Sequence, residues 1–288
     1  MDLFKEEIND ILELGAYENL WLQEKMSFKM VSTLLNKAGV FVSDIVEREV
    51  SLESYEKIKK IFNDKGLNDV CSTFWWGENY PTSLKDASYP IYMFYSRGNL
   101  ELLHAQRSVA VVGSRQASDM GLKRAEVLAK RLVDDGVLVV SGLAKGIDTV
   151  ALSTAINRGG RVLAVIGTAI SEYYPRDNKE LQNKIAQEHL LVSQVPVLKY
   201  LSQGAWINRF FFPERNVTMS ALSQATIIVE AGETSGTLVQ ARAAINQGRK
   251  LFILENCFHK GLKWPEKYVQ RGAHRVSSYE QIREIMGW

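Results

Sequence analysis

The stretch that decides the fold is SVAVVGSRQASDMGLKRAEVLAKRL, which runs from Ser108 to Leu132. Its first residues are small or β-branched, and they predict a strand over Val109 to Val112. A Gly-Ser-Arg turn follows. Apolar residues then recur at three- and four-residue spacing, which predicts a helix over Ser118 to Asp135. A strand that passes through a short turn into an amphipathic helix is the repeating unit of an α/β sheet.

The same rhythm of strand, turn and helix continues to the end of the chain. A second clear helix is predicted over Ser235 to Gln247, where Gly248 ends it. The other predicted strands are apolar almost throughout, as are strands that a parallel sheet buries on both faces. We therefore expect a Rossmann-like, doubly wound, mostly parallel α/β sheet over residues 104–288. The further strands are predicted over Leu138 to Val140, Val162 to Ile166, Leu190 to Val195, Thr226 to Glu230 and Leu251 to Leu254.

The region before this sheet has a different pattern. Residues 1–70 place apolar side chains at helical spacing, which predicts a small helical domain of the SAM-like or helix-hairpin-helix-like kind. Residues 71–103 mix aromatic residues with Pro, Gly and Asn, which predicts a linker with short strands that leads into the main domain. The sequence predicts a boundary near Leu103.

The composition excludes several classes of protein. Of the 288 residues, 46% are hydrophobic and 24% are charged, which is typical of folded globular proteins rather than disordered or membrane-spanning ones. The acidic N-terminus lacks the pattern of an export signal, so we expect a cytoplasmic protein with no membrane partner. Cys71 and Cys257 are isolated, and the four histidines lack metal-ligand spacing, so we expect no metal and no cofactor.

The residues that follow the predicted strands are the candidate binding site. Ligands of an open parallel sheet bind beyond the carboxyl ends of its strands, and small residues there allow main-chain N–H groups to approach an anion. Cations and aromatic rings follow the same strands. The small candidates are Gly113, Ser114, Ser141, Gly142, Gly167, Ser235, Gly236 and Thr237; the cations are Arg115, Lys145, Arg176, Arg209 and Arg215; the rings are Tyr174 and Phe211.

Arg115 stands where a dinucleotide-binding turn would place further glycines. The turn GSRQAS lacks the second and third glycines of the GxGxxG pattern. A guanidinium group above a Gly-Ser turn favours the phosphate of a polymer or of a simple nucleotide over NAD or FAD. Sites for single-stranded nucleic acid typically place cations along the path of its phosphate backbone and aromatic side chains on which its bases stack.

Several motifs in order resemble the DNA-processing protein A family (DprA, also called Smf). The resemblance covers the chain from about Tyr80 to its end and is specific because the motifs occur as an ordered set. The motifs are VAVVGSR, VVSGLAKGIDTVA, AVIGTAI, YYPRDNKELQ, FPERNVTMSALSQATIIVEAGETSGTLVQARAAINQGRKLF and RGAHRV.

The resemblance implies a protein that binds single-stranded DNA, protects incoming DNA during natural transformation and loads the RecA recombinase. It also implies a homodimer that is not an enzyme. The positions that the family's motifs assign to DNA are Gly113, Ser114, Arg115, Ser141, Gly142, Arg176, Asn178, Arg215 and Asn216.

An enzyme is the alternative interpretation. Nucleotide phosphoribohydrolases of the lysine-decarboxylase-like group share a Rossmann-like sheet, and the stretch AGETSGTL is similar to one of their turns. Asp148 or Glu230 would then act as an acid or base on a nucleoside monophosphate. Asp148 is better explained as a helix N-cap, and Glu230 as a partner of a pocket cation.

Overall fold

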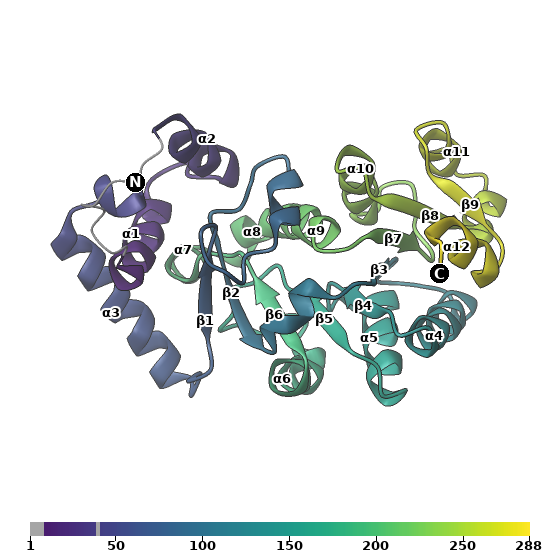
Figure 1. Cartoon of the computed structure of the whole chain (residues 1–288), viewed down its shortest axis with the longest axis horizontal. Helices are drawn as coiled ribbons and strands as arrows, with labels where there is room; N and C mark the ends of the chain where they lie inside the picture. The colour runs from purple at the N-terminus through teal and green to yellow at the C-terminus, as the bar shows by residue number, and fades with distance from the viewer. Residues whose placement is uncertain (1–8, 39–40) are drawn as a thin grey trace.

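The computed structural model describes residues 9–38 and 41–288, and over these residues the chain forms one nine-stranded sheet (Figure 1). The order across the sheet is β1-β2-β6-β5-β4-β3-β7-β8-β9. The strands are β1 (Cys71–Phe74), β2 (Met93–Gly98), β3 (Ser108–Val112), β4 (Leu138–Ser141), β5 (Val162–Val165), β6 (Leu190–Ser193), β7 (Ala225–Ile228), β8 (Lys250–Leu254) and β9 (His274–Val276).

Most of the strands are parallel. β3 lies between β4 and β7 and is parallel to both, with Val109 opposite Val139 on one side and Ala225 on the other. Parallel pairing continues outward to β6 and to β9, whereas β2 pairs antiparallel with β6 and β1 pairs antiparallel with β2. This arrangement confirms the predicted Rossmann-like, mostly parallel sheet.

The strands are apolar throughout because helices cover both faces of the sheet. In β3, Val109 and Val111 belong to one hydrophobic core, and the alternate residues Ala110 and Val112 belong to the other. Ala125, Leu128 and Leu132 of the first core come from the predicted helix that follows this strand; the side chain of its N-cap, Ser118, accepts a hydrogen bond from Gly121. Burial on both faces explains why these strands show no alternation of polar and apolar residues.

The two layers of helices follow directly from this topology (Figure 1). α4 (Asp119–Asp134), α5 (Ile147–Asn157) and α6 (Lys179–Glu188) cover one face, and α9 (Phe211–Ala221), α10 (Thr237–Asn246) and α11 (Trp264–Val269) cover the other. The remaining helices are α1 (Asp10–Leu22), α2 (Phe28–Ala38), α3 (Arg48–Asp64), α7 (Val197–Ser202), α8 (Ala205–Asn208) and α12 (Tyr279–Met286). Short 3₁₀ turns occupy Val42–Asp44, Thr82–Asp86, Leu100–His104, Arg176–Asn178 and Glu255–Lys260.

The N-terminal helices share a hydrophobic core with the sheet. Trp21 of α1 and Phe28 of α2 both pack against Phe211 of α9, and Tyr17 stacks on Tyr92 of the segment before β2. Residues 71–103, which we expected to be a linker, contribute β1 and β2 to the same sheet. The domain limits at residues 70 and 103 stay predictions. The start of the predicted helical region, residues 1–8, lies outside the described residues.

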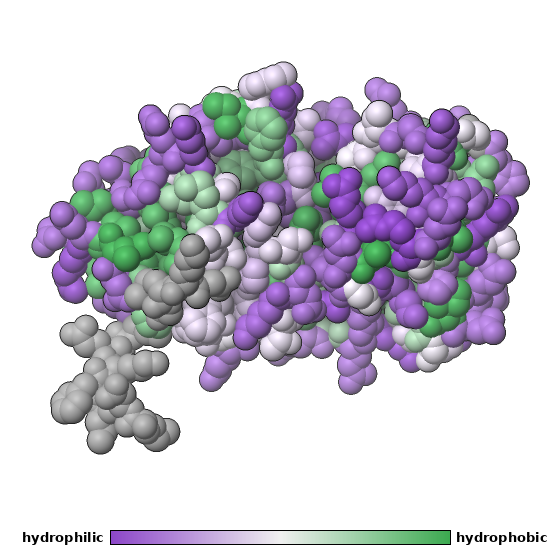
Figure 2. All heavy atoms as spheres, turned by 90° about the horizontal axis from the view of Figure 1, so that it is seen from above, coloured by the Kyte–Doolittle hydropathy of each residue, from purple (hydrophilic) through white to green (hydrophobic). Residues whose placement is uncertain are grey.

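The surface matches this organisation. Seen from above, hydrophobic residues gather at the end formed by the N-terminal helices, and hydrophilic residues cover much of the opposite end (Figure 2). Among the helices of the described residues, none combines the length and the apolar character that crossing a bilayer requires.

Candidate functional site

A pocket lies where the strand order reverses, between the carboxyl ends of β3 and β7. The chain continues from β3 to β4 on one side, and the later strands β7, β8 and β9 add on the other side. Open α/β sheets bind their ligands at such a switch point. The pocket has a volume of about 610 Å³, and we call it the switch-point pocket. Its lining is Val112 to Gln116, Ala144, Asp148, Phe212, Pro213, Arg215, Asn216, Gly232, Thr234 to Thr237, Val239 and Gln240.

The turn after β3 is held tightly by its own hydrogen bonds. A Cβ atom at Gly113 would meet the side chain of Ile147 and the carbonyl oxygen of Glu230, so only glycine fits there. The Ser114 N–H donates to the Glu230 carbonyl oxygen (2.7 Å), and the Gln116 N–H donates to Ser114 Oγ (3.1 Å). These amides are therefore already bonded, and the turn presents the exposed side chain of Arg115 to a ligand.

Arg115 lies close to two aromatic rings. Its guanidinium carbon is 5.4 Å from the centre of the Phe212 ring and 6.0 Å from the centre of the Tyr174 ring. The two rings are themselves 5.3 Å apart, and Tyr174 is 47% exposed. A cation beside exposed rings can hold a phosphate while a base stacks next to it.

Helix α9 brings a second arginine to the pocket wall. Phe212, Arg215 and Asn216 are three and four positions apart, so they share one face of the helix. Arg215 is buried; its Nη1 donates to the carbonyl oxygens of Gly142 and Val165 (2.7 Å for the latter). Burial lowers its pKa to about 10. Arg215 therefore joins the ends of β4 and β5, and its charge lies within the wall.

The small residues after β4 and β5 make room for α9 instead of forming an anion cradle. A Cβ atom at Gly142 would collide with the Arg215 guanidinium group, and one at Gly167 would collide with the Phe212 ring. The Gly142 N–H donates to Asp148 Oδ2 (3.1 Å), and the Ser141 hydroxyl donates to the Val111 carbonyl oxygen (2.7 Å). None of these three predicted residues lines the pocket.

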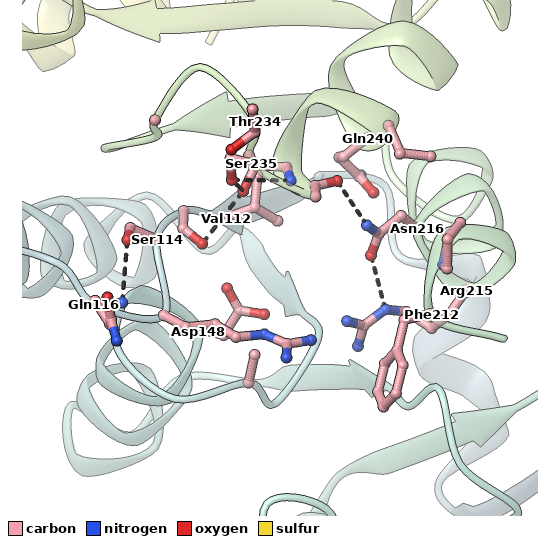
Figure 3. Close-up of a pocket in the computed structure, with 18 residues that line it drawn as sticks. Val112, Ser114, Gln116, Asp148, Phe212, Arg215, Asn216, Thr234, Ser235 and Gln240 are labelled. Atoms are coloured by element: carbon pink, nitrogen blue, oxygen red, sulfur yellow. Dashed lines mark hydrogen bonds between the residues drawn. The ribbon is translucent and has the colours of Figure 1, made fainter. Parts of the chain in front are cut away.

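The start of α10 forms the far wall (Figure 3). The Thr237 N–H donates to Ser235 Oγ (3.2 Å), and the Thr237 hydroxyl donates to the Gly113 carbonyl oxygen (3.3 Å). Asn216 Nδ2 donates to the Gly236 carbonyl oxygen (3.1 Å), while its Oδ1 accepts from Arg215 Nε (2.9 Å). Asn216 thus ties the Arg215 guanidinium group to the start of α10.

The two carboxylates of the enzyme interpretation hold turns in place. Burial raises the pKa of Asp148, although the charge of Arg215 opposes this. Asp148 lies in the first turn of α5, whose N-cap is Gly146, so its assignment as the N-cap was wrong. Glu230 accepts hydrogen bonds from the main-chain N–H (3.1 Å) and the hydroxyl (2.7 Å) of Ser118, the N-cap of α4. Within the described ranges, His, Cys, Asp and Glu side chains do not gather into a group that could hold a metal ion.

Four predicted residues lie beside the pocket but do not line it: Tyr174, described above, and Lys145, Arg176 and Asn178. Lys145 forms an ion pair with Asp177 (2.5 Å), and Arg176 is exposed nearby. Asn178 is buried, and its Nδ2 donates to the Leu143 carbonyl oxygen (2.9 Å) and to Thr149 Oγ1 (2.8 Å). The side-chain amide nitrogen of Asn178 therefore points into the protein, where it braces the loop between β4 and α5.

Phe211 and Arg209 also differ from their predicted places. Phe211 is only 7% exposed and packs against Trp21 and Phe28, so it is a core residue and cannot stack on a base. Its neighbour Phe212 lines the pocket instead. Helical spacing in the sequence could have identified Phe212 as the pocket ring, because Phe212 is the ring that shares a helix face with Arg215 and Asn216. Arg209 lies outside the pocket lining.

Comparisons with known proteins agree with this fold. A family model described as DNA recombination-mediator protein A matches residues 72–287. The DNA processing protein DprA of Streptococcus pneumoniae is 35% identical over 235 residues, which cover 81% of this chain and 80% of that protein. The protein Smf of Escherichia coli is 35% identical over 71% of this chain and 53% of its own length.

Solved structures show the same similarity. The X-ray structure of DNA processing protein A from Streptococcus pneumoniae superimposes with a TM-score of 0.67 at 29% identity, and the match covers 96% of this chain and 92% of that one. A structure of DNA processing protein A from Helicobacter pylori, described for its single-stranded DNA binding mode, gives a TM-score of 0.64 at 24% identity. The latter match covers 75% of this chain and 95% of that one.

Proposed function

The chain belongs to the DNA recombination-mediator protein A family, and from this premise we propose that its switch-point pocket binds single-stranded DNA. A role in DNA processing follows from the family. The observation that carries the proposal is the group formed by Arg115, Phe212 and Tyr174 at the carboxyl edge of the sheet. A flexible single strand can place a phosphate on the guanidinium group and turn a base onto a ring, whereas the bases of a duplex are already stacked.

The pocket wall supports this assignment electrostatically. Arg215 adds a second positive charge behind Arg115, and its hydrogen bonds to main-chain carbonyl groups keep that charge in place. A preorganised cation loses little conformational entropy when the strand binds. In this proposal Arg115 contacts the strand, and Arg215 stabilises the wall and contributes to the field.

We also propose that the protein binds and hands over DNA rather than transforming it chemically. As in the family resemblance, the bound strand would be incoming DNA of natural transformation, protected and then loaded with the RecA recombinase by a homodimer. The description of the family as a recombination mediator supports this sequence of events. The hydrogen bonds that already occupy Asp148 and Glu230 weigh against their use as an acid and a base.

A binding titration tests the proposal. Labelled oligo-dT and a duplex of equal length are titrated with the protein at two salt concentrations. We expect tight binding to the single strand only, with an affinity that falls as salt rises, because bound phosphates release their counterions. Arg115→Ala should weaken binding to every sequence alike and make the salt dependence shallower by about one unit of slope.

The matched control is Arg161→Ala. Arg161 is also exposed, but it precedes β5 and therefore lies at the opposite edge of the sheet. Equal losses in the two variants would show that only total charge matters and would contradict the pocket assignment. Release of free adenine from AMP, without affinity for oligo-dT, would favour the phosphoribohydrolase interpretation instead.

A further inference from the structure

Helix α8 carries an unusually exposed aromatic surface. Trp206 is 71% exposed and Phe210, just after the helix, is 61% exposed. The guanidinium carbon of Arg209 lies 3.2 Å from the centre of the Trp206 ring and 5.1 Å from that of Phe210. We call these three residues the Trp206 platform. Exposed rings around a stacked guanidinium group form a surface suited to a planar, electron-rich group such as a nucleobase.

A groove opens beside this platform. It has a volume of about 540 Å³ and lies between the turn that joins α1 to α2 and the segment from α8 into α9. Phe210 and Ile207 form one wall, and Trp21 and Phe28 contribute to the other. The full lining is Trp21, Glu24 to Phe28, Lys199, Gln203, Ile207, Phe210, Phe211 and Glu214.

The charges around the groove favour an anion. Lys25 and Lys199 line it and Arg209 stands beside it, and the ion pairs found among residues 9–38 and 41–288 engage none of the three. Within the part of the chain that the structure describes, Lys199 donates only to the main-chain oxygen of Gln23 (3.3 Å). The two acidic residues of the lining are the exposed Glu24 and the half-buried Glu214, and burial raises the pKa of the latter. Unpaired cations beside aromatic rings suit a strand of phosphates and bases better than an apolar protein segment.

The groove and the switch-point pocket lie on two sides of the same helix end. Three consecutive rings show this: Phe212 lines the pocket, whereas the exposed Phe210 and the buried Phe211 line the groove. A strand that leaves the pocket past Phe212 therefore meets Phe210 after passing around the start of α9. The N-terminal helices supply the far wall of the groove, which would give them a part in binding.

We propose that this groove, with the Trp206 platform, is a second station for the same single strand, in which bases beyond those in the pocket stack on Trp206 and Phe210. The inference rests on the proposed function, because it concerns the path of the strand that the pocket holds. It predicts two binding regions that differ in the strand length they require. Short strands need only the pocket, and longer strands use the groove as well.

The test compares strand lengths. Oligo-dT of about six and of about twenty nucleotides is titrated with the wild type and with Trp206→Ala and Phe210→Ala, since these lengths lie near the lower limit and above the upper limit of the roughly 4–16 nucleotides that a single OB fold covers. We expect each variant to bind the long strand about tenfold more weakly, because one base stack contributes about 1–3 kcal/mol, and to bind the short strand like the wild type. Trp75→Ala is the matched control, because Trp75 is 45% exposed in the turn between β1 and β2, outside the groove lining. Thermal melting checks that every variant is folded.

Photocrosslinking provides a second, independent readout. An oligo-dT strand that carries 5-bromouracil should crosslink to a peptide that contains Trp206 in the wild type. Variants at Trp206 and Phe210 that match Trp75→Ala on both strand lengths, with crosslinks at the pocket only, would overturn the second station and leave the pocket intact. A change of oligomeric state with unchanged strand affinity would also overturn it, in favour of a protein interface. A wild type that binds neither strand would instead refute the proposed function.

Discussion

At the scale of single residues, the three consecutive phenylalanines show how neighbours can have different roles. Phe211 is enclosed by Trp21, Phe28 and Tyr200, whereas Phe212 faces Arg115 in the pocket. The composition of the stretch cannot distinguish the rings, because they are chemically identical. Their roles depend on the rotation of α9 about its axis, which places successive residues about a quarter of a turn apart.

This difference predicts opposite effects of two substitutions. Phe211→Ala should lower the free energy of unfolding by about 3–5 kcal/mol, because it leaves a cavity in the core. While the protein is folded, it should change little the affinity for a short strand, which needs only the switch-point pocket. Phe212→Ala should change the stability less and should weaken oligo-dT binding by about 1–3 kcal/mol. Urea unfolding and strand titration measure the two effects. Equal effects of both substitutions on affinity would contradict the assignment of these rings.

At the scale of elements, a buried carboxylate joins α1 to α7. Glu18 accepts hydrogen bonds from the main-chain N–H groups of Val197 and Leu198 (2.7 and 2.8 Å) and from the hydroxyl of Tyr95 (2.5 Å). The free N–H groups at the start of α7 suit such an acceptor. Burial nevertheless raises the pKa of Glu18 from 4.5 to about 7.

The raised pKa makes this contact sensitive to pH. Between pH 4.5 and about 7 the folded protein binds a proton at Glu18 that the unfolded chain releases. Protonation of Glu18 therefore stabilises the folded protein fully below pH 4.5, and this stabilisation is lost as pH rises through about 7. The total change in the free energy of unfolding is on the order of 3 kcal/mol. Urea unfolding of the wild type and of Glu18→Gln across this range measures the effect.

The variant provides the reference in that experiment. Other carboxylates titrate in both proteins, so the difference in unfolding free energy between them isolates Glu18. We expect the wild type to lose stability relative to Glu18→Gln as pH rises from 5 to 7.5, with the loss steepest between the two pKa values of Glu18 and levelling off above the folded-state pKa of about 7. Parallel pH profiles of the two proteins would show that burial does not shift the pKa of Glu18.

At the scale of the whole molecule, one hydrophobic core runs from the N-terminal helices to the sheet. It contains Leu14 and Trp21 of α1, Phe74 of β1, and Val109 and Val111 of β3. Regions that share a core of this kind unfold together, because neither can expose its side of the contact without loss of buried apolar area.

A single cooperative transition is therefore the expected result of thermal unfolding. Near-ultraviolet circular dichroism, which includes the aromatic residues of the N-terminal helices, should give the same midpoint as far-ultraviolet circular dichroism, which follows all the helices. Two separate midpoints would show instead that residues 1–70 form an independent domain, as the pattern of the sequence predicts.

Prediction from the sequence was most successful for the strands. Val162 to Ile166 was predicted and β5 covers Val162–Val165, because a continuous apolar run is a local property of the chain. The strand His274–Val276 was missed, because three residues with a histidine and an arginine form no such run. In the site, Arg115, which we predicted from its turn, lines the switch-point pocket, whereas Asn178 was predicted to bind there but is turned inward.

The sequence by itself therefore determined the alternation of strands and helices, the Rossmann-like sheet and the chemical types of residue at its carboxyl edge, because hydrophobic periodicity and turn chemistry are written locally. Only the tertiary structure decided which of those residues meet in the pocket, that Arg215 and Asn178 brace loops, and that the N-terminal helices flank a groove beside Trp206. These outcomes depend on how α9 is rotated against glycines that lie far from it in the sequence, at the ends of β4 and β5. No local pattern specifies such a long-range steric fit.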